Sequence, residues 1–223
     1  MTQIASKNSS WQWSVEPDRD RIAALVAKHA ATEYRLPISP TMRAAIEPAI
    51  ERLLAERDRG CALVLDAGCG TGASTAALAE RYPDAFVVGV DRSAARLRKA
   101  PSLPSNALLV RARLEEFWLM AHRAQLVFER TFLLYPNPYP KRWQIGRRWY
   151  GHPIFPTILA TSRSIELRTN VEWYAAEFSF ALQLCSWESV FKSLSSEALT
   201  PFERKYATQH QPLWIVSAEA RRQ

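Results

Sequence analysis

Three glycines and one acid carry the clearest chemical signal in this sequence. Gly68, Gly70 and Gly72 follow a short apolar run, so the chain can turn tightly there and a ligand can approach its backbone. Asp91 ends the next apolar run, about 20 residues beyond the turn, where an acid in an α/β fold can accept both hydroxyl groups of a ribose. An ordinary strand–helix turn followed by an unrelated acid would give the same pattern.

The form of the turn separates these interpretations. The segment reads Asp66-Ala-Gly-Cys-Gly-Thr-Gly72, whereas a dinucleotide site has Gly-x-Gly-x-x-Gly. It resembles the first motif of class I S-adenosylmethionine (SAM) methyltransferases, in which the turn wraps the amino acid part of a cofactor without a pyrophosphate. The resemblance implies SAM as the cofactor, held by Asp66, Gly68, Gly70 and Asp91. We expect Asp91 to bind the ribose, and Asp66 either to lie near the methionine end or to order the turn.

A second chemical signal lies in the stretch Tyr135–Lys141. Prolines occupy alternate positions there, at 136, 138 and 140, which stiffens the backbone and removes three hydrogen-bond donors. At the end of a strand, such a segment would hold Asn137 and Tyr139 rigidly beside a methyl donor. A stiffened surface loop without a chemical role is the other interpretation. The first interpretation predicts that Asn137 is the catalytic residue.

Cations and aromatic rings follow this stretch. The cations are Lys141, Arg142, Arg147 and Arg148, and the rings are those of Trp143, Trp149 and Tyr150. Nucleic-acid sites combine cations for phosphates with aromatic planes for bases. The net charge of +7 also favours a polyanionic partner. We therefore expect tRNA or another RNA as the partner, with a solvated basic loop as the alternative.

Several motifs resemble, in order, those of the bacterial tRNA (guanine-N7) methyltransferases. That family has Phe-Pro-Asp-Pro-Trp-Pro-Lys where this chain has Tyr135-Pro-Asn-Pro-Tyr-Pro-Lys141. Its Thr-Asp pair corresponds to Thr169-Asn170, and its C-terminal Thr-x-Phe-Glu motif to Thr200-Pro-Phe-Glu203. The resemblance implies methylation of a guanine N7 in tRNA or a related RNA. It also implies a substrate site made of Lys141, Arg147, Arg148, Asn170, Thr200 and Glu203.

The chain departs from that family at three acidic positions. Asn137 and Asn170 replace its two substrate-side acids, and Arg113 stands where it has an acid near the adenine, with Glu115 just beyond. The resemblance thus places Arg113 and Glu115 in the cofactor site. Because N7 already carries a lone pair, its methylation needs positioning rather than a general base. We expect these changes to affect guanine selectivity more than turnover.

Two other functions fit the same residues. Asn137-Pro-Tyr139 is similar to the Asn-Pro-Pro-aromatic motif of exocyclic-amine methyltransferases, with two residues transposed. This similarity implies transfer to another base or to a small nitrogen heterocycle. The third function is a non-catalytic RNA-binding protein on the same scaffold. The intact glycine turn and Asp91 argue against it.

The composition limits the number of domains, the bound groups and the cellular location that we expect. A length of 223 residues with 48% hydrophobic residues suffices for the core of one α/β domain. The three cysteines have no CxxC or paired pattern and the four histidines have no metal-ligand spacing, so we expect neither disulfides nor a metal. No segment resembles a signal peptide or approaches the roughly 20 apolar residues of a membrane helix, so we expect a cytoplasmic protein.

Hydrophobic periodicity predicts alternating strands and helices from Cys61 onward. An apolar run predicts a strand at 62–65, and further strands are expected at 86–90, 107–110, 126–134 and 164–168, with a final pair at 187–192 and 213–216. This pattern is typical of a doubly wound, mostly parallel α/β sheet of seven strands, the Rossmann-like fold of class I methyltransferases. Two earlier helices, one after Asp18 and one at Thr41–Arg57, predict an N-terminal helical extension (1–60) ahead of the methyltransferase domain (61–223).

Overall fold

Helices and strands alternate along most of the chain. The computed structural model describes residues 18–195, 198–209 and 211–221. Its elements are α1 (Arg19–Ala30), α2 (Pro40–Asp58), β1 (Ala62–Ala67), α3 (Ala73–Arg81), β2 (Ala85–Asp91), α4 (Ala94–Leu97), β3 (Ala107–Arg111), α5 (Leu114–Arg123), β4 (Phe128–Leu134), the 3-10 helices η1 (Arg142–Arg147) and η2 (Trp149–Gly151), α6 (Phe155–Ala160), β5 (Ser162–Thr169), α7 (Glu172–Leu184), β6 (Trp187–Ser193), α8 (Pro201–Thr208) and β7 (Trp214–Ala220).

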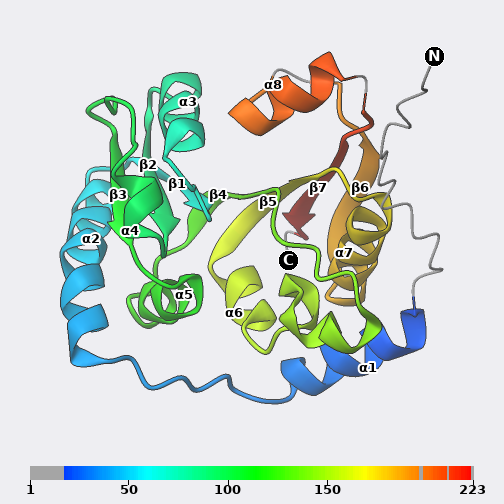
Figure 1. Ribbon diagram of the computed structural model, residues 1–223. Coiled ribbons are helices and arrows are strands. Elements are labelled where there is room, and N and C mark those ends of the chain that lie inside the picture. The colour runs from blue at the N-terminus through cyan, green and yellow to red at the C-terminus, as the bar shows by residue number, and fades with distance from the viewer. Residues whose placement is uncertain (1–17, 196–197, 210, 222–223) are drawn as a thin grey trace, which may run out of the picture.

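One seven-stranded sheet organises these elements (Figure 1). Its strand order is β3-β2-β1-β4-β5-β7-β6, with β1 to β5 parallel and β7 antiparallel to both of its neighbours. The predicted fold class is therefore confirmed, including the antiparallel final pair. The strand order reverses between β1 and β4. Ligands of such sheets bind beyond the carboxyl ends of the strands at this switch point, where the glycine turn and the proline-rich stretch both begin.

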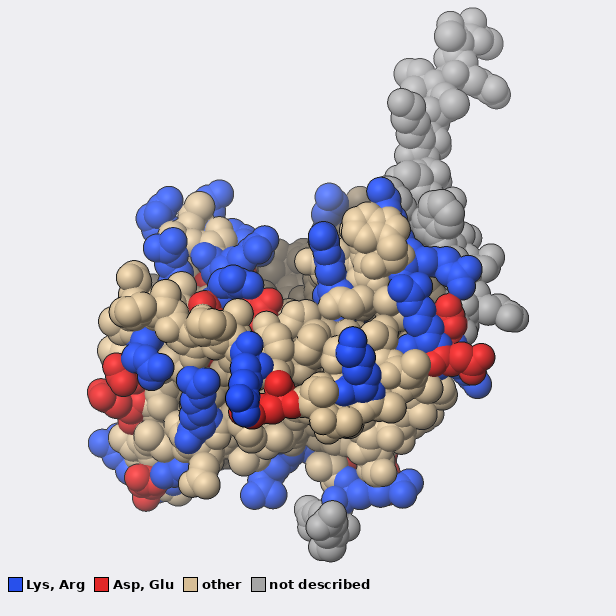
Figure 2. All heavy atoms as spheres, turned by 90° about the horizontal axis from the view of Figure 1, so that it is seen from below, with Lys and Arg blue, Asp and Glu red and all other residues tan. Residues whose placement is uncertain are grey.

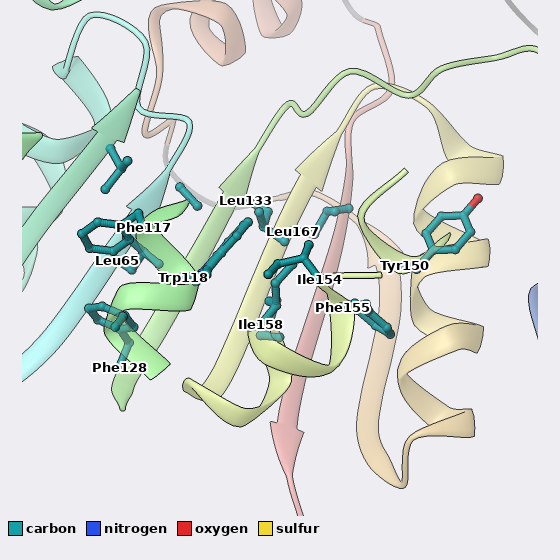
Figure 3. Close-up of a cluster of buried hydrophobic side chains, with 14 of the residues drawn as sticks. Leu65, Phe117, Trp118, Phe128, Leu133, Tyr150, Ile154, Phe155, Ile158 and Leu167 are labelled. Carbon is teal, nitrogen blue, oxygen red and sulfur yellow. The ribbon is translucent and has the colours of Figure 1, made fainter. Parts of the chain in front are cut away.

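Helices cover both faces of the sheet. Figure 1 shows α3 and α8 on one side and α1, α5 and α6 on the other. The larger core lies on the second side, where Ile22 of α1, Leu53 of α2 and Trp118 of α5 join Leu65 of β1 in one buried cluster. Figure 3 shows Trp118 and Ile158 lying between their helices and the strands. The two helices before β1 thus share their core with the sheet.

The strands at the centre explain the continuous apolar runs of the sequence. Every residue of β2 is buried, and so are all residues of β1 except Ala62, because helices pack on both faces there. The parallel register pairs Asp66 with Gly89 and Ala67 with Val90. The carboxyl ends of β1 and β2 are therefore level, which brings the glycine turn beside Asp91.

Two segments are helical where the sequence predicted no helix. The C-terminal motif forms α8, because the Thr200 hydroxyl accepts a hydrogen bond from the backbone N–H of Glu203 at 3.0 Å and caps the helix. The basic stretch after Pro140 forms η1 and η2. The longest helix, α2, has 19 residues, and no helix of the described ranges is both long and apolar enough to cross a membrane.

We predict that Gly89→Ala destabilises the sheet next to the glycine turn. A Cβ atom at this position would overlap the Thr75 hydroxyl and lie 2.7 Å from Cδ2 of Leu109. Overpacking of this kind costs about 1–3 kcal/mol of unfolding free energy, which equilibrium urea denaturation measures. Gly146→Ala is the matched control, because the nearest atom to a Cβ there is 4.0 Å away. Equal losses in the two variants would contradict the packing argument.

Candidate active site

The glycine turn has the backbone conformation that its residue types favour. Gly68, Gly70 and Gly72 have φ angles of +88°, +61° and +78°, which only glycine adopts without strain. The backbone N–H groups of Gly68 and Cys69 both donate to the carbonyl oxygen of Val90, at 2.8 and 3.1 Å. The turn is thus tied to the end of β2, and it exposes its backbone along the carboxyl edge of the sheet.

Asp91 is the acid nearest to this turn. Its carboxylate is buried and accepts hydrogen bonds from the backbone N–H of Gly70 at 3.1 Å and of Ser93 at 2.7 Å. The guanidinium of Arg96 also lies 3.2 Å from Oδ1 of Asp91. The acid is therefore held in a fixed orientation at the place where a nucleoside site needs it.

Asp66 ties the end of β1 to the helix that follows the glycine turn. Its carboxylate accepts hydrogen bonds from the hydroxyls of Ser74 at 2.6 Å and Thr75 at 2.7 Å, both in the first turn of α3. Burial raises the pKa of Asp66 to about 6, although the two hydroxyls oppose this shift. Asp66 lines neither of the cavities described below. Of the two positions expected for Asp66, near the methionine end of SAM or as a residue that orders the turn, the structure favours the second, because Asp66 joins β1 to α3.

Two cavities meet at the switch point. The Asp91 cavity, of about 550 Å³, is lined by Asp91 and by residues after β2 and β3, including Arg113 and Glu115. The α8 cavity, of about 690 Å³, lies between the glycine turn, the proline-rich stretch and α8. Both volumes are typical of small-molecule sites. The residues that line both cavities are Gly68, Arg96, Leu134, Tyr135, Pro136 and Asn137.

The proline-rich stretch forms the wall between the cavities, and its backbone is strained. Tyr135 and Tyr139 have φ angles of +53° and +47°, a conformation that costs about 1–3 kcal/mol in a bulky residue. Between them, the Asn137 side-chain oxygen accepts a hydrogen bond from the backbone N–H of Tyr139 at 3.0 Å. The amide N–H groups of Asn137 donate no hydrogen bond to a described residue, and Asn137 lines both cavities. This arrangement agrees with the rigid loop that the prolines predict.

Arg148 fastens this loop to the body of the protein. Its guanidinium donates to the backbone oxygen of Tyr139 at 3.1 and 3.2 Å, pairs with Glu177 of α7 at 2.6 Å and stacks on the ring of Trp173. Arg148 is buried, so the expectation that it binds RNA phosphates is corrected. Lys141 and Arg147 are exposed on the same segment, and only Arg147 lines the Asp91 cavity.

Aromatic rings and prolines dominate the wall of the α8 cavity. The centroid of the Phe202 ring lies 4.4 Å from the centroid of the Tyr135 ring and 4.1 Å from that of the Tyr206 ring. Trp173 also lines this cavity. Asn170 and Thr200 also line this cavity, as the sequence suggested for a substrate site. Among its described lining residues, Arg96 alone carries a charge at neutral pH. The cavity therefore suits a flat, largely apolar molecule.

Glu203 lies behind this cavity and does not line it. Its buried carboxylate pairs with Arg168 of β5 at 2.9 Å and accepts from the backbone N–H of Leu199 at 2.6 Å. These bonds attach the start of α8 to the sheet. The predicted contact of Glu203 with a substrate is thus corrected to a structural ion pair, because the acid points into the protein.

Sequence reasoning missed the aromatic wall and Arg96. Phe202 and Tyr206 are four residues apart, a spacing that would have indicated one face of a helix if the Thr200 cap had been noticed. Arg96 follows the helix cap Ser93 by three residues, and nothing in its spacing marks it as special. Its position depends on the contact with Asp91.

The surroundings of the site are basic. The exposed arginines that line the Asp91 cavity are Arg92, Arg96, Arg113 and Arg147. Figure 2 shows Lys and Arg side chains standing in two groups on either side of a hollow at the upper edge of the view. In the described part of the chain, no three His, Cys, Asp or Glu side chains are grouped so that they could hold a metal ion.

Comparison with a protein-family model identifies the cofactor-binding half of this site. Residues 64–147 match the family described as "Methyltransferase domain". This segment runs from β1 to the end of η1, and it contains the glycine turn, Asp91 and the Tyr135–Lys141 stretch. The glycine turn without side chains, the buried carboxylate and the adjoining cavity fit a nucleoside with an amino acid tail. SAM is therefore the cofactor, as the sequence predicted.

Curated relatives match a limited part of the chain. The trans-aconitate 2-methyltransferase of Pseudomonas paraeruginosa (strain DSM 24068 / PA7) is 43% identical over 70 residues, which are 31% of this chain and 25% of that protein. The protein of the same name from Escherichia coli O1:K1 / APEC is 35% identical over 86 residues, 39% of this chain and 34% of that protein. The match thus spans about a quarter to a third of these relatives.

Solved structures confirm the fold over most of the chain. The 16S rRNA (adenine(1408)-N(1))-methyltransferase from Catenulisporales acidiphilia superposes with a TM-score of 0.55 at 14% identity, covering 77% of this chain and 92% of that one. The 16S rRNA methyltransferase KamB gives a TM-score of 0.55 at 16% identity, covering 85% and 97%. At such identities the likeness concerns the fold alone.

The predicted membership of the tRNA (guanine-N7) methyltransferases is wrong. The sequence matches instead lead to the "Methyltransferase domain" model and to relatives named trans-aconitate 2-methyltransferase. The motifs that carried the resemblance were short, and the structure uses Arg148 and Glu203 from them in buried ion pairs. Such pairs need only a charge at the right place in the fold, so they do not identify a substrate.

We predict that Asp91→Asn weakens SAM binding at least tenfold. A hydrogen bond from a ligand hydroxyl to a charged acceptor is worth about 1.5–3 kcal/mol, and the amide leaves one neutral acceptor where the carboxylate has two charged oxygens. Titration calorimetry with SAM measures the change, and circular dichroism checks that the fold is retained. Unchanged affinity would refute the placement of the ribose at Asp91.

We predict that Arg148→Met lowers the unfolding free energy by about 3–5 kcal/mol, because it leaves the buried Glu177 without its cationic partner. Urea denaturation measures this loss. The neighbouring Arg147→Met is the matched control, since this exposed side chain should change stability by less than about 0.5 kcal/mol. Equal stability of both variants would mean that Arg148 does not support the fold.

Proposed function

We propose that the protein is a SAM-dependent methyltransferase that acts on a small heteroaromatic molecule bound in the α8 cavity. The observation that carries this proposal is the aromatic wall of that cavity, which shares Tyr135 and Asn137 with the cofactor-side Asp91 cavity. A flat ring between Tyr135, Trp173 and Phe202 would lie next to the common wall, where a methyl group can pass from one cavity to the other. Stacking on these rings would supply the binding energy.

The ionisable groups of the α8 cavity restrict the acceptor atom. Its described lining residues include no His, Asp, Glu or Lys. The lining thiol of Cys69 and the phenol of Tyr135 have pKa values raised well above their ordinary range, chiefly by burial, so neither serves as a base near neutral pH. The acceptor must therefore offer a lone pair without losing a proton first. A ring nitrogen has this property, and it supports the heterocycle among the functions that the sequence left open.

The residues of the common wall would act by positioning. SAM supplies an electrophilic methyl group, and transfer requires the acceptor atom to lie in line with it. Asn137 uses its side-chain oxygen within the loop, so its amide donors are what it can offer to a substrate. Arg148 and the prolines keep this amide in place. Water is kept from the transfer by the apolar rings around the cavity.

The names of the curated relatives suggest trans-aconitate as a second candidate substrate. Their name, trans-aconitate 2-methyltransferase, gives trans-aconitate as the substrate. An ionised carboxylate of such a molecule could accept a methyl group without a base. Trans-aconitate has three carboxylates, whereas Arg96 is the one charged group among the described residues of the α8 cavity. This poor match in charge makes the tricarboxylate the weaker candidate.

The proposed function is tested with purified protein and SAM that carries a radioactive methyl group. Pooled small heteroaromatic compounds, trans-aconitate and total RNA are offered in separate reactions. We expect label in the heteroaromatic pool, and mass spectrometry then identifies the acceptor atom. Label in trans-aconitate alone would select the second candidate. Label in RNA alone would refute a small-molecule substrate.

We predict that Asn137→Asp lowers kcat/KM for the identified acceptor about tenfold or more. The aspartate can still accept from the backbone N–H of Tyr139, so the loop keeps its shape, but it has lost the amide donors. SAM affinity, measured by calorimetry, should stay unchanged. Trp143→Ala serves as the control, because this exposed ring lines neither cavity. Full activity of Asn137→Asp would exclude a donor role for Asn137.

A further inference from the structure

We infer that Arg96 binds an anionic group of the substrate and that cofactor binding makes it available for this role. The inference rests on the proposed function and narrows the substrate class to heteroaromatic acids. It starts from the contact between Arg96 and Asp91, which joins a residue of the substrate cavity to the acid of the cofactor site.

The acceptor capacity of Asp91 shows why the two ligands are linked. Oδ1 accepts from the backbone N–H of Ser93 and forms an ion pair with the Arg96 guanidinium at 3.2 Å, while Oδ2 accepts from the backbone N–H of Gly70. A carboxylate oxygen has about two acceptor sites, so each oxygen has one site left, but the Arg96 guanidinium is already in contact with Oδ1. A ribose hydroxyl that donates to Oδ1 needs space that the Arg96 guanidinium occupies, so we expect the ribose to displace Arg96.

Displacement of Arg96 is easy, whereas displacement of the backbone donors is not. The Arg96 side chain is 52% exposed, and ion pairs with such an exposed partner are weak. Ser93 and Gly70 donate from the backbone of the α4 cap and of the glycine turn, which are fixed by the fold. Arg96 is thus the one partner of Asp91 that can leave without a change of the backbone.

After displacement from Asp91, the Arg96 side chain can turn into the α8 cavity. Arg96 lines this cavity as well as the Asp91 cavity, and its Nη1 lies 4.0 Å from the position that a Cβ on Gly70, a residue of the α8 cavity, would occupy. The α8 cavity has no carboxylate among its described lining residues, so the guanidinium would find no protein partner there. A carboxylate on the substrate would provide one, with paired N–H···O bonds.

This arrangement predicts an order of binding. Without cofactor, Arg96 is paired with Asp91, which weakens its attraction for an anion in the α8 cavity. With cofactor, the ribose occupies Asp91 and Arg96 is available, so an anionic substrate binds more tightly. Linkage requires the reverse effect to be equal, and an anionic substrate should also strengthen cofactor binding.

Benzoate and benzamide, which differ in charge and have nearly the same shape, test this inference by calorimetry. S-adenosylhomocysteine (SAH) is used as the cofactor, because its neutral sulfur does not attract an anion. With saturating SAH, we expect benzoate to bind at least tenfold more tightly than benzamide. Without SAH the preference should fall below threefold. In Arg96→Met with SAH the preference should vanish, while SAH affinity stays the same or rises.

Arg98→Met is the matched control, since Arg98 is an exposed arginine two residues away that lines neither cavity. It should keep the preference for benzoate. Equal binding of the two probes with SAH, no binding of benzoate, or an unchanged preference in Arg96→Met would each overturn the inference. Failure of the wild-type protein to bind SAH would overturn the proposed function itself, so the two failures are distinguishable.

Discussion

The site depends on the buried carboxylate of Asp91. Its bond to the backbone of Gly70 exists because β1 and β2 pair in parallel register with their carboxyl ends level. The same register lets the start of the turn bond to Val90. The conformation of the turn, the orientation of the acid and the position of Arg96 thus all follow from one strand pairing, with both strands locked between helices.

Two buried ion pairs fix the segments on the substrate side of the site. Arg148 with Glu177 fixes the loop that holds Asn137, and Arg168 with Glu203 fixes the start of α8. Buried pairs gain little net stability over apolar packing, since both charges lose water. Here they define where a strained loop and a short helix lie relative to the sheet. The aromatic cavity between these two segments exists only while both are held in place.

Much of the fold could be predicted from the sequence because it rests on local rules. Strands buried on both faces leave apolar runs, and β1 and β2 lie where these runs are. The fourth strand was predicted from Leu126 but begins at Phe128. Gln125 has a φ of +54°, and the Leu126 N–H bonds back to Ala121, so the end of α5 takes up the first residues. The hydrophobic pattern does not predict this turn at the end of α5, so it could not give the first residue of the strand.

The sequence by itself determined the fold class, because strands and helices alternate along it, and the glycine turn with Asp91, because both lie within one strand–turn–helix–strand unit. The resemblance of that turn to the SAM motif then indicated the cofactor. Only the tertiary structure decided which charged groups face a ligand. Arg147 and Arg148 are neighbours in sequence, yet one is exposed and the other is buried against Glu177. Whether a cation meets solvent or an acid depends on elements far apart in the chain, and short motifs contain no record of that pairing.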